Sequence, residues 1–143
     1  MDSELADLAE AILGVGRELR LRTQAGAVQL TAQEAHVMRH IDHHPGVTPS
    51  DVARATGLQR SNLSTALRAL ERRGFVERRA DPHDARGINL FPTDRAADNL
   101  KRLRRQWADQ LASALGGGDL QNAAAAKALL QRVEAGLVAD RLG

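Results

Sequence analysis

The sequence predicts a mainly helical fold of the α+β class, a winged helix-turn-helix with a two-stranded β-hairpin wing and further helices at both ends. Three observations predict it: two short amphipathic segments meet at Gly57, a hairpin pattern with a basic tip follows them, and longer apolar-striped segments lie on either side. The 143 residues suit a single domain. Within it we expect a winged helix-turn-helix lobe at 31–91 and a helical dimerisation region at 4–22 plus 94–142.

The first helix is expected over residues 4–22, where apolar residues recur at helical spacing: Leu5, Leu8, Ile12, Val15 and Leu19. Gly14 and Gly16 lower its propensity, and Gln24-Ala25-Gly26 is expected to end it. The second helix begins at Thr31-Ala32-Gln33-Glu34, a capping box in which Thr31 accepts from the Glu34 amide while Glu34 reaches back. It turns Val37, Met38 and Ile41 inward and ends near His44-Pro45-Gly46.

The next two helices form the predicted helix-turn-helix. Thr48-Pro49-Ser50-Asp51 opens a short helix with a cap, a proline at its first position and an acid at its third. Ala53 allows close approach of the second helix, Gly57 suits a turn with positive φ, and Leu63 follows six residues later as a core contact. Val52, Leu58 and Leu67 fill the remaining buried positions.

The second helix of this pair has one apolar and one polar face. Its apolar stripe, Leu63, Ala66, Leu67 and Leu70, is expected to face the core, and Gly74 to end the helix in a left-handed conformation. Such a helix can enter the DNA major groove with its N-terminus first. The residues that would then meet DNA are Gln59, Arg60, Ser61, Asn62, Ser64, Thr65, Arg68 and Arg72.

A hairpin is expected behind this helix, with strands at 75–79 and 87–91 and the tip Asp81-Pro82-His83-Asp84-Ala85-Arg86-Gly87 between them. An arginine that projects from a hairpin can enter the narrow, electronegative minor groove, so Arg86 is a second candidate DNA contact. Asp84 either pairs with Arg86 or braces the loop.

A long helix is expected from Pro92-Thr93-Asp94 until Gly116-Gly117-Gly118, with Ala96, Leu100, Leu103, Trp107, Leu111 and Ala114 on one face. Asp119 is expected to cap a last helix whose inward residues are Ala126, Leu130, Val133 and Leu137. The stripes of these helices need a covering surface because the lobe fills its own interior. A symmetric homodimer provides one. A monomeric helical cap folded back on the lobe is the alternative.

Charge is unevenly distributed along the chain. The formal net charge is +2, but residues 59–105 hold twelve Arg and Lys against six Asp and Glu, a surplus of six. A basic centre indicates a polyanion-binding face and therefore double-stranded DNA as a partner. Compositional bias toward arginine is the simpler explanation. A winged-helix module that binds only proteins, the other class considered, does not need this surplus.

Several classes are disfavoured by what the sequence lacks. With no cysteine, it can have no disulfide or thiolate metal site. Its apolar runs are too short to span a membrane, and its acidic N-terminus does not resemble a signal peptide, so we expect a cytoplasmic protein. We expect neither enzymatic activity nor a cofactor, because Gly116-Gly117-Gly118 lacks the remainder of a phosphate loop and no nucleophile motif occurs.

Four histidines gather on or just after the second helix: His36, His40, His43 and His44. His36 and His40 have the i, i+4 spacing of metal ligands, which raises the hypothesis of a zinc-responsive regulator. No H-E-x-x-H motif or well-placed carboxylate supports it, so no metal site is predicted. Histidines at the surface or at a dimer interface are the simpler explanation.

Three stretches resemble the MarR family of bacterial transcriptional regulators: L-T-A-Q-E-A-H-V-M (30–38), V-A-R-A-T-G-L-Q-R-S-N-L-S-T-A-L-R-A-L-E-R-R-G-F-V-E-R (52–78) and D-P-H-D-A-R-G (81–87). The resemblance implies an obligate homodimer, binding to a pseudo-palindromic operator, repression, and release by a small-molecule effector of aromatic or phenolic type. It also implies that Arg86 is the minor-groove arginine with Asp84 as its partner. Candidate effector-pocket residues are Arg17, His36, His40 and Arg104, and ordinary surface side chains are the alternative explanation for all four.

The sequence departs from the family pattern at two places. After the wing the family often has L-T-P-x-G-R-A, whereas this chain has L-F-P-T-D-R-A at 90–96. Phe91 therefore replaces a capping threonine, and we expect Thr93 to take over the cap. Position 59 is Gln where a short capping side chain is common, which leaves Gln59 available to read a base.

Overall fold

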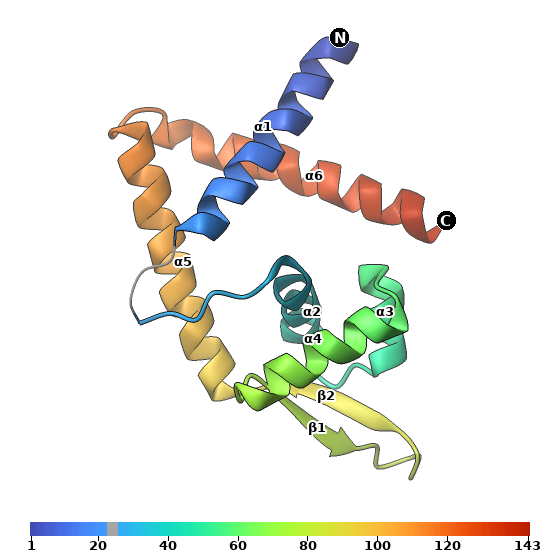
Figure 1. Cartoon of the computed structure of the whole chain (residues 1–143). Helices are drawn as coiled ribbons and strands as arrows, with labels where there is room; N and C mark the ends of the chain where they lie inside the picture. The colour runs from blue at the N-terminus through green and yellow to red at the C-terminus, as the bar shows by residue number, and fades with distance from the viewer. Residues whose placement is uncertain (23–25) are drawn as a thin grey trace. The chain divides into compact units, whose positions relative to one another are not determined.

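The computed structural model describes residues 1–22 and 26–143. The expected helix break at Gln24 and Ala25 lies outside the described residues. The elements, in chain order, are α1 (Asp2–Leu21), α2 (Ala32–His43), α3 (Pro49–Thr56), α4 (Arg60–Arg72), β1 (Val76–Ala80), β2 (Ile88–Pro92), α5 (Asp94–Leu115), the short 3₁₀ helix η1 (Leu120–Asn122) and α6 (Ala123–Leu142) (Figure 1). The predicted mainly helical fold with a two-stranded wing is thereby confirmed.

The described chain divides into two compact units. The first comprises residues 1–29 and 99–118, which are α1 and most of α5. The second comprises residues 30–98 and 119–143, which are α2, α3, α4, the hairpin, the start of α5, η1 and α6. None of the described helices is both long and apolar enough to cross a membrane.

The second unit is organised around one apolar core to which α2, α3, α4 and the hairpin all contribute. Its buried members are Val37, Met38, Ile41, Val52, Leu63, Ala66, Leu67, Leu70, Phe75, Val76, Leu90 and Ala96. These include the residues predicted for the core of the second helix and of the helix-turn-helix pair, except Leu58, which is only half-buried against the core. Because helices from both sides of the turn bury side chains in the same core, α4 is held with one face inward.

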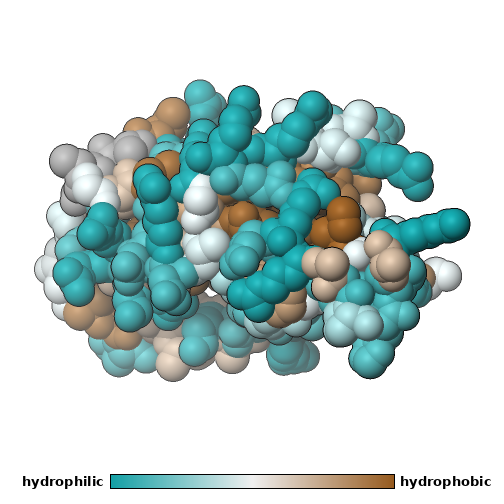
Figure 2. Space-filling view, turned by 90° about the horizontal axis from the view of Figure 1, so that it is seen from below, coloured by the Kyte–Doolittle hydropathy of each residue, from teal (hydrophilic) through white to brown (hydrophobic). Residues whose placement is uncertain are grey.

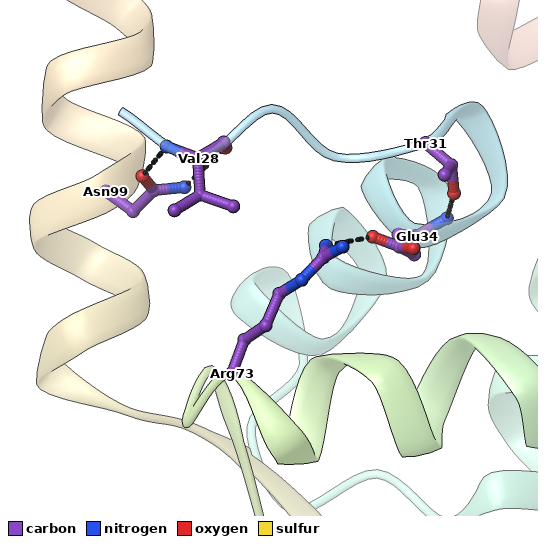
Figure 3. Close-up of polar contacts among 5 residues, drawn as sticks. All are labelled: Val28, Thr31, Glu34, Arg73 and Asn99. Carbon is purple, nitrogen blue, oxygen red and sulfur yellow. Dashed lines mark hydrogen bonds and ion pairs between the residues drawn. The ribbon is translucent and has the colours of Figure 1, made fainter. Parts of the chain in front are cut away.

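Side-chain caps set the start of three helices. The Thr31, Thr48 and Thr93 hydroxyls accept from the backbone amides three residues later at 3.1, 3.2 and 3.2 Å. Thr93 thus takes over the cap of α5, as expected from the departure at Phe91. The second half of the predicted capping box is wrong, since the Glu34 carboxylate turns toward Arg73 and lies 2.6 Å from its guanidinium (Figure 3).

The wing is an antiparallel hairpin with Val76 opposite Pro92 and Ala80 opposite Ile88. Both strands lie one residue later than expected. A bridge between Val47 and Leu90 adds a short third segment beside β2, with the Leu90 amide donating to the Val47 carbonyl at 2.8 Å. At the hairpin base the Thr93 hydroxyl donates to the Gly74 carbonyl at 2.5 Å. The base of the hairpin is therefore held to the lobe by hydrogen bonds.

In the first unit, Asn99 of α5 holds the chain that precedes α2. Its side-chain oxygen accepts from the Val28 amide at 2.7 Å and its side-chain nitrogen donates to the Val28 carbonyl at 3.0 Å (Figure 3). The side chain thus pairs with a backbone residue as a neighbouring strand would. Arg102 adds a hydrogen bond to the Gly26 carbonyl at 2.9 Å.

The terminal helices differ from expectation in two respects. The predicted cap at Asp119 is wrong: Asp119 has φ 58, makes no capping hydrogen bond and precedes η1, and α6 begins only at Ala123. Among the described residues, neither α1 nor α6 has a buried side chain, so the apolar stripes of both helices stay largely exposed there. Leu5, Val15 and Leu137 are 60, 51 and 66% exposed. On α5 the expected stripe is covered only toward its start, because Leu103 is buried and Leu111 is 45% exposed.

Candidate nucleic-acid interface

Helix α4 presents a polar face because its opposite face is fixed in the core. Leu63, Ala66, Leu67 and Leu70 are 0–4% exposed. The helix period then turns Ser61, Thr65, Arg68 and Arg72 outward, and all four are exposed. The predicted separation of α4 into a buried and a free face is thus what the structure has.

The N-terminal end of α4 is open to solvent. Gln59 is the N-cap residue in an extended conformation, φ −65 and ψ 152, and its side chain makes no capping hydrogen bond. Gln59, Arg60, Asn62 and Ser64 are all exposed. These amide, hydroxyl and guanidinium groups are suited to hydrogen bonding with base edges and phosphates.

Acidic charge on the outer face of α4 is neutralised from within the lobe. Glu71 lines a shallow hollow together with Thr65, Arg68 and Arg72. Its carboxylate forms an ion pair with Arg78 of β1. Because the Glu71 charge is already paired with Arg78, the positive charges of Arg68 and Arg72 make the hollow basic.

The turn between α3 and α4 is fixed by local hydrogen bonds. Gly57 has φ 71, the left-handed conformation for which glycine is suited. The buried Thr56 hydroxyl donates to the Val52 carbonyl at 2.7 Å and accepts from the Leu58 amide at 3.4 Å. The direction in which α4 leaves the turn is thereby determined close to its first residue.

At the wing tip, carboxylates brace the backbone. Asp84 accepts from the Arg86 amide at 2.9 Å, and Asp81 accepts from the His83 amide at 2.8 Å. Gly87 closes the loop because a Cβ there would lie 2.9 Å from the Asp81 Cβ. Of the two roles considered for Asp84, the structure shows the bracing one. The Arg86 side chain is exposed and forms no ion pair with any carboxylate in the described part of the chain.

Arg79 lies on the wing but outside the predicted set. Its guanidinium carbon is 4.2 Å from the centroid of the Phe91 ring across the hairpin. The same ring packs beside Gly46, where an added Cβ would be 3.4 Å away. Phe91 therefore serves as a platform for a cation on the wing. In the hairpin Arg79 lies opposite Asn89 and Glu77 opposite Phe91, so Arg79 and the Phe91 ring occupy diagonal positions.

The four predicted effector residues are distributed between the two units. Arg17 on α1 and Arg104 on α5 belong to the first, and His36 and His40 on α2 belong to the second. Arg17, His36 and Arg104 are exposed, and His40 is half-buried. Their assignment to a pocket stays a prediction.

The histidine cluster is organised by ring stacking. The His40 and His44 rings are 4.4 Å apart between centroids, and the His44 ring nitrogen lies 3.2 Å from the His40 carbonyl. Burial and, secondarily, the neighbouring His44 lower the pKa of His40, and burial raises the pKa of Asp42. Within the described residues, no three His, Asp or Glu side chains gather as a metal-binding group.

Figure 2 shows the molecule from below, the side on which α4 and the hairpin lie in Figure 1. Hydrophilic side chains project over most of this face, and apolar atoms appear between them. Projecting hydrophilic side chains therefore make up most of the surface seen in this view.

Comparison with known proteins agrees with this geometry. Residues 28–87 match the model of the MarR family. The uncharacterised HTH-type transcriptional regulator YybA of Bacillus subtilis (strain 168) is 26% identical over 79% of this chain and 75% of its own length. FabT of Streptococcus pneumoniae, solved in complex with DNA, has a TM-score of 0.67 at 23% identity, with 96% of this chain and 97% of FabT covered. The PcaV regulator of Streptomyces coelicolor, solved with its natural ligand, has a TM-score of 0.61 at 24% identity, with 89% of each chain covered.

Two of these proteins, YybA and PcaV, are transcriptional regulators by name. The matched segment includes both short helices and the entire wing tip. The chain is therefore a winged helix-turn-helix protein whose residues 28–87 match the MarR family of transcriptional regulators.

Proposed function

We propose that this protein is a sequence-specific regulator that binds double-stranded DNA as a homodimer. Helix α4 enters the major groove and the wing reaches the minor groove. The single observation that carries the proposal is the exposed polar face of α4, whose inner face is fixed in the core. The free guanidinium of Arg86 at the braced wing tip supports the minor-groove contact.

A second copy of the chain is the proposed cover for the apolar stripes of the terminal helices. Leu5, Val15, Leu130 and Leu137 are 60, 51, 41 and 66% exposed in the single chain. Exposed leucines and valines at helical spacing on two helices are typical of an interface. Two-fold symmetry would place two α4 helices about one turn of DNA apart and match a pseudo-palindromic operator.

We further propose that the protein is a repressor released by a small molecule. Support comes from PcaV, a relative solved with its natural ligand. A ligand of aromatic or phenolic type, near Arg17, His36, His40 and Arg104, is the hypothesis to test. Thermal-shift screening of such compounds should raise the melting temperature for a true effector, and the same compound should lower DNA affinity.

The experiment that tests DNA binding begins with selection from random duplex DNA. We expect a pseudo-palindromic site, and recovery of none would contradict the proposal. On that site Arg86→Ala should weaken binding by about 1–3 kcal/mol if Arg86 contacts base edges. Arg132→Ala, at an exposed arginine of α6, is the matched control and should bind as the wild type does.

Salt dependence tests the same surface independently. Several phosphates must be neutralised, so the affinity should fall steeply as salt rises. A phosphate-contacting arginine, such as Arg72, should on removal reduce the slope of log K against log salt by about 1. An affinity indifferent to salt would exclude the basic face as the contact surface.

A further inference from the structure

Two polar contacts join α6 to the DNA-binding lobe within the second unit. Arg39 of α2 and Glu134 of α6 form a two-point ion pair, with nitrogen–oxygen distances of 2.5 and 3.0 Å. Arg141 lies seven residues further along α6, which is about two turns and therefore the same side of the helix. Its guanidinium donates to the Arg54 and Ala55 carbonyls of α3 at 3.2 and 2.5 Å.

The Arg141 guanidinium contacts the C-terminal end of α3, where a positive charge is most favourable. The last carbonyls of a helix have no partner within the helix, and they form the negative end of its dipole. Gly57, the residue that ends α3, makes room for the guanidinium, because a Cβ at that position would lie 2.9 Å from the Arg141 Nη1. The turn of the helix-turn-helix is thus shaped to accept a side chain from the C-terminal helix.

Apolar packing contributes little to this attachment. No residue of α6 is buried, and only Val138 is half-buried among them. The Arg39 and Glu134 side chains are 56 and 47% exposed, so their ion pair adds little stability. Directional contacts of this kind determine orientation more than they determine whether the lobe folds.

We infer that Arg141, with the Arg39–Glu134 pair, is a positioning residue that fixes the helix-turn-helix relative to α6. Because α3 and α4 share the core through Val52 and Leu63, an orientation imposed on α3 is passed to the DNA-reading helix. This inference rests on the proposed dimeric DNA binding. If α6 contributes to the dimer, the clasp formed by Arg39, Glu134 and Arg141 determines the separation of the two α4 helices.

The first test does not require DNA. The chain has no cysteine, so Ser50→Cys and Ala128→Cys, both at exposed positions, introduce two labelling sites on α3 and α6. Spin-labelled protein is mixed with excess unlabelled protein, so that distances within one protomer are read. We expect a narrow distance distribution that broadens in Arg141→Ala and narrows again in Arg141→Lys, which retains the charge. An unchanged width in Arg141→Ala would overturn the inference.

The Arg39–Glu134 ion pair can be tested by exchanging its two charges. Arg39→Glu and Glu134→Arg should each broaden the distribution, and the double variant should restore it. Arg132→Ala removes an exposed arginine of α6 outside the clasp and should leave the width unchanged. If the double variant remains as broad as the single ones, the Arg39–Glu134 pair has no positioning role.

The last test uses DNA duplexes that carry the two half-sites at different spacings. The wild type should prefer one spacing strongly. In Arg141→Ala the ratio of Kd values between a displaced and the preferred spacing should fall by about tenfold, the lower end of the factor expected from loss of a hydrogen bond to a charged group. A variant that loses affinity equally at all spacings would show a merely structural role and overturn the inference. Absence of DNA binding by the wild type would instead contradict the proposed function, and the distance measurement would still decide on the clasp.

Discussion

At the scale of single residues, Asp84 contacts the backbone of Arg86 and not its guanidinium. Its carboxylate accepts from the Arg86 amide and so orders the loop from which the arginine projects. The side chain of Arg86 is thereby left for a ligand. We therefore expect position 84 to require an acceptor oxygen rather than a negative charge.

Asp84→Ala and Asp84→Asn separate these two roles. Asp84→Ala should weaken operator binding by about 1 kcal/mol, because the loop loses the hydrogen bond that orders it. Asp84→Asn retains an acceptor and should bind nearly as the wild type does. Equal losses in both variants, measured by fluorescence anisotropy, would show that the charge itself matters.

Local residue chemistry could be predicted from the sequence, and distant partners could not. Thr31, Thr48, Thr93 and Gly57 act where capping and turn preferences place them. The pairing of Glu34 with Arg73 joins residues 39 apart in sequence, and the contact of Arg141 with Ala55 joins residues 86 apart. No periodicity records such pairings, because they depend on how finished helices pack.

At the scale of elements, Thr93, the residue that precedes α5, makes two hydrogen bonds with its hydroxyl. The Thr93 hydroxyl accepts from the Ala96 amide and donates to the Gly74 carbonyl, so it caps α5 and closes the hairpin base. Thr93→Ala should lower the free energy of unfolding by about 0.5–2 kcal/mol through the lost cap. Thr93→Ser should keep most of it. Urea unfolding at one fixed protein concentration measures both, since oligomer stability depends on concentration.

Helix α2 should make stability depend on pH through His40. Its pKa is lowered from 6.5 in the folded protein by burial, by His44 and, more weakly, by His36 and His43, against the opposing charge of Asp51. The unfolded chain therefore binds this proton at higher pH than the folded one. The stability that neutral His40 contributes is present above pH 6.5. It is lost as the pH falls from 6.5 toward the lower pKa that His40 has in the folded protein.

Chemical denaturation between about pH 7.5 and pH 5.5 tests this effect. The free energy of unfolding should decrease toward the acidic end, and His40→Gln should show a smaller decrease. Asp42, whose pKa burial raises, contributes the opposite slope in the more acidic range. An identical pH slope in wild type and His40→Gln would contradict the assignment.

Elements were predicted to within a few residues where their ends carry a chemical signal. Asp119 is the exception: an aspartate after three glycines reads as a helix cap, but the chain makes a 3₁₀ turn there first. The strands lie one residue later than expected because their alternation is weak: β1 is exposed after its first residue, and most of β2 is half-buried. Their register is determined instead by contacts with the lobe at Val47 and Thr93.

At the scale of the whole molecule, the terminal helices predict the oligomeric state. Leu130→Glu combined with Leu137→Glu places charges on the exposed stripe of α6 and should shift the protein from dimer to monomer. Gln131→Glu, at an exposed polar position on the same helix, should leave the dimer intact. Sedimentation equilibrium distinguishes the two outcomes. A wild type that sediments as a monomer at micromolar concentration would favour a helical cap instead.

The wing tip is closed by its own backbone and two of its own aspartates, while the hairpin foot is held by Thr93 and the Leu90–Val47 bridge. These two sets of bonds share no residue. We therefore expect residues 82, 83, 85 and 86 to tolerate replacement without a change in the stem, provided that Asp81, Asp84 and Gly87 are kept, because these three close the tip. If the wing reads DNA as proposed, grafting other residues at these four positions should change the operator preference at little cost to the fold.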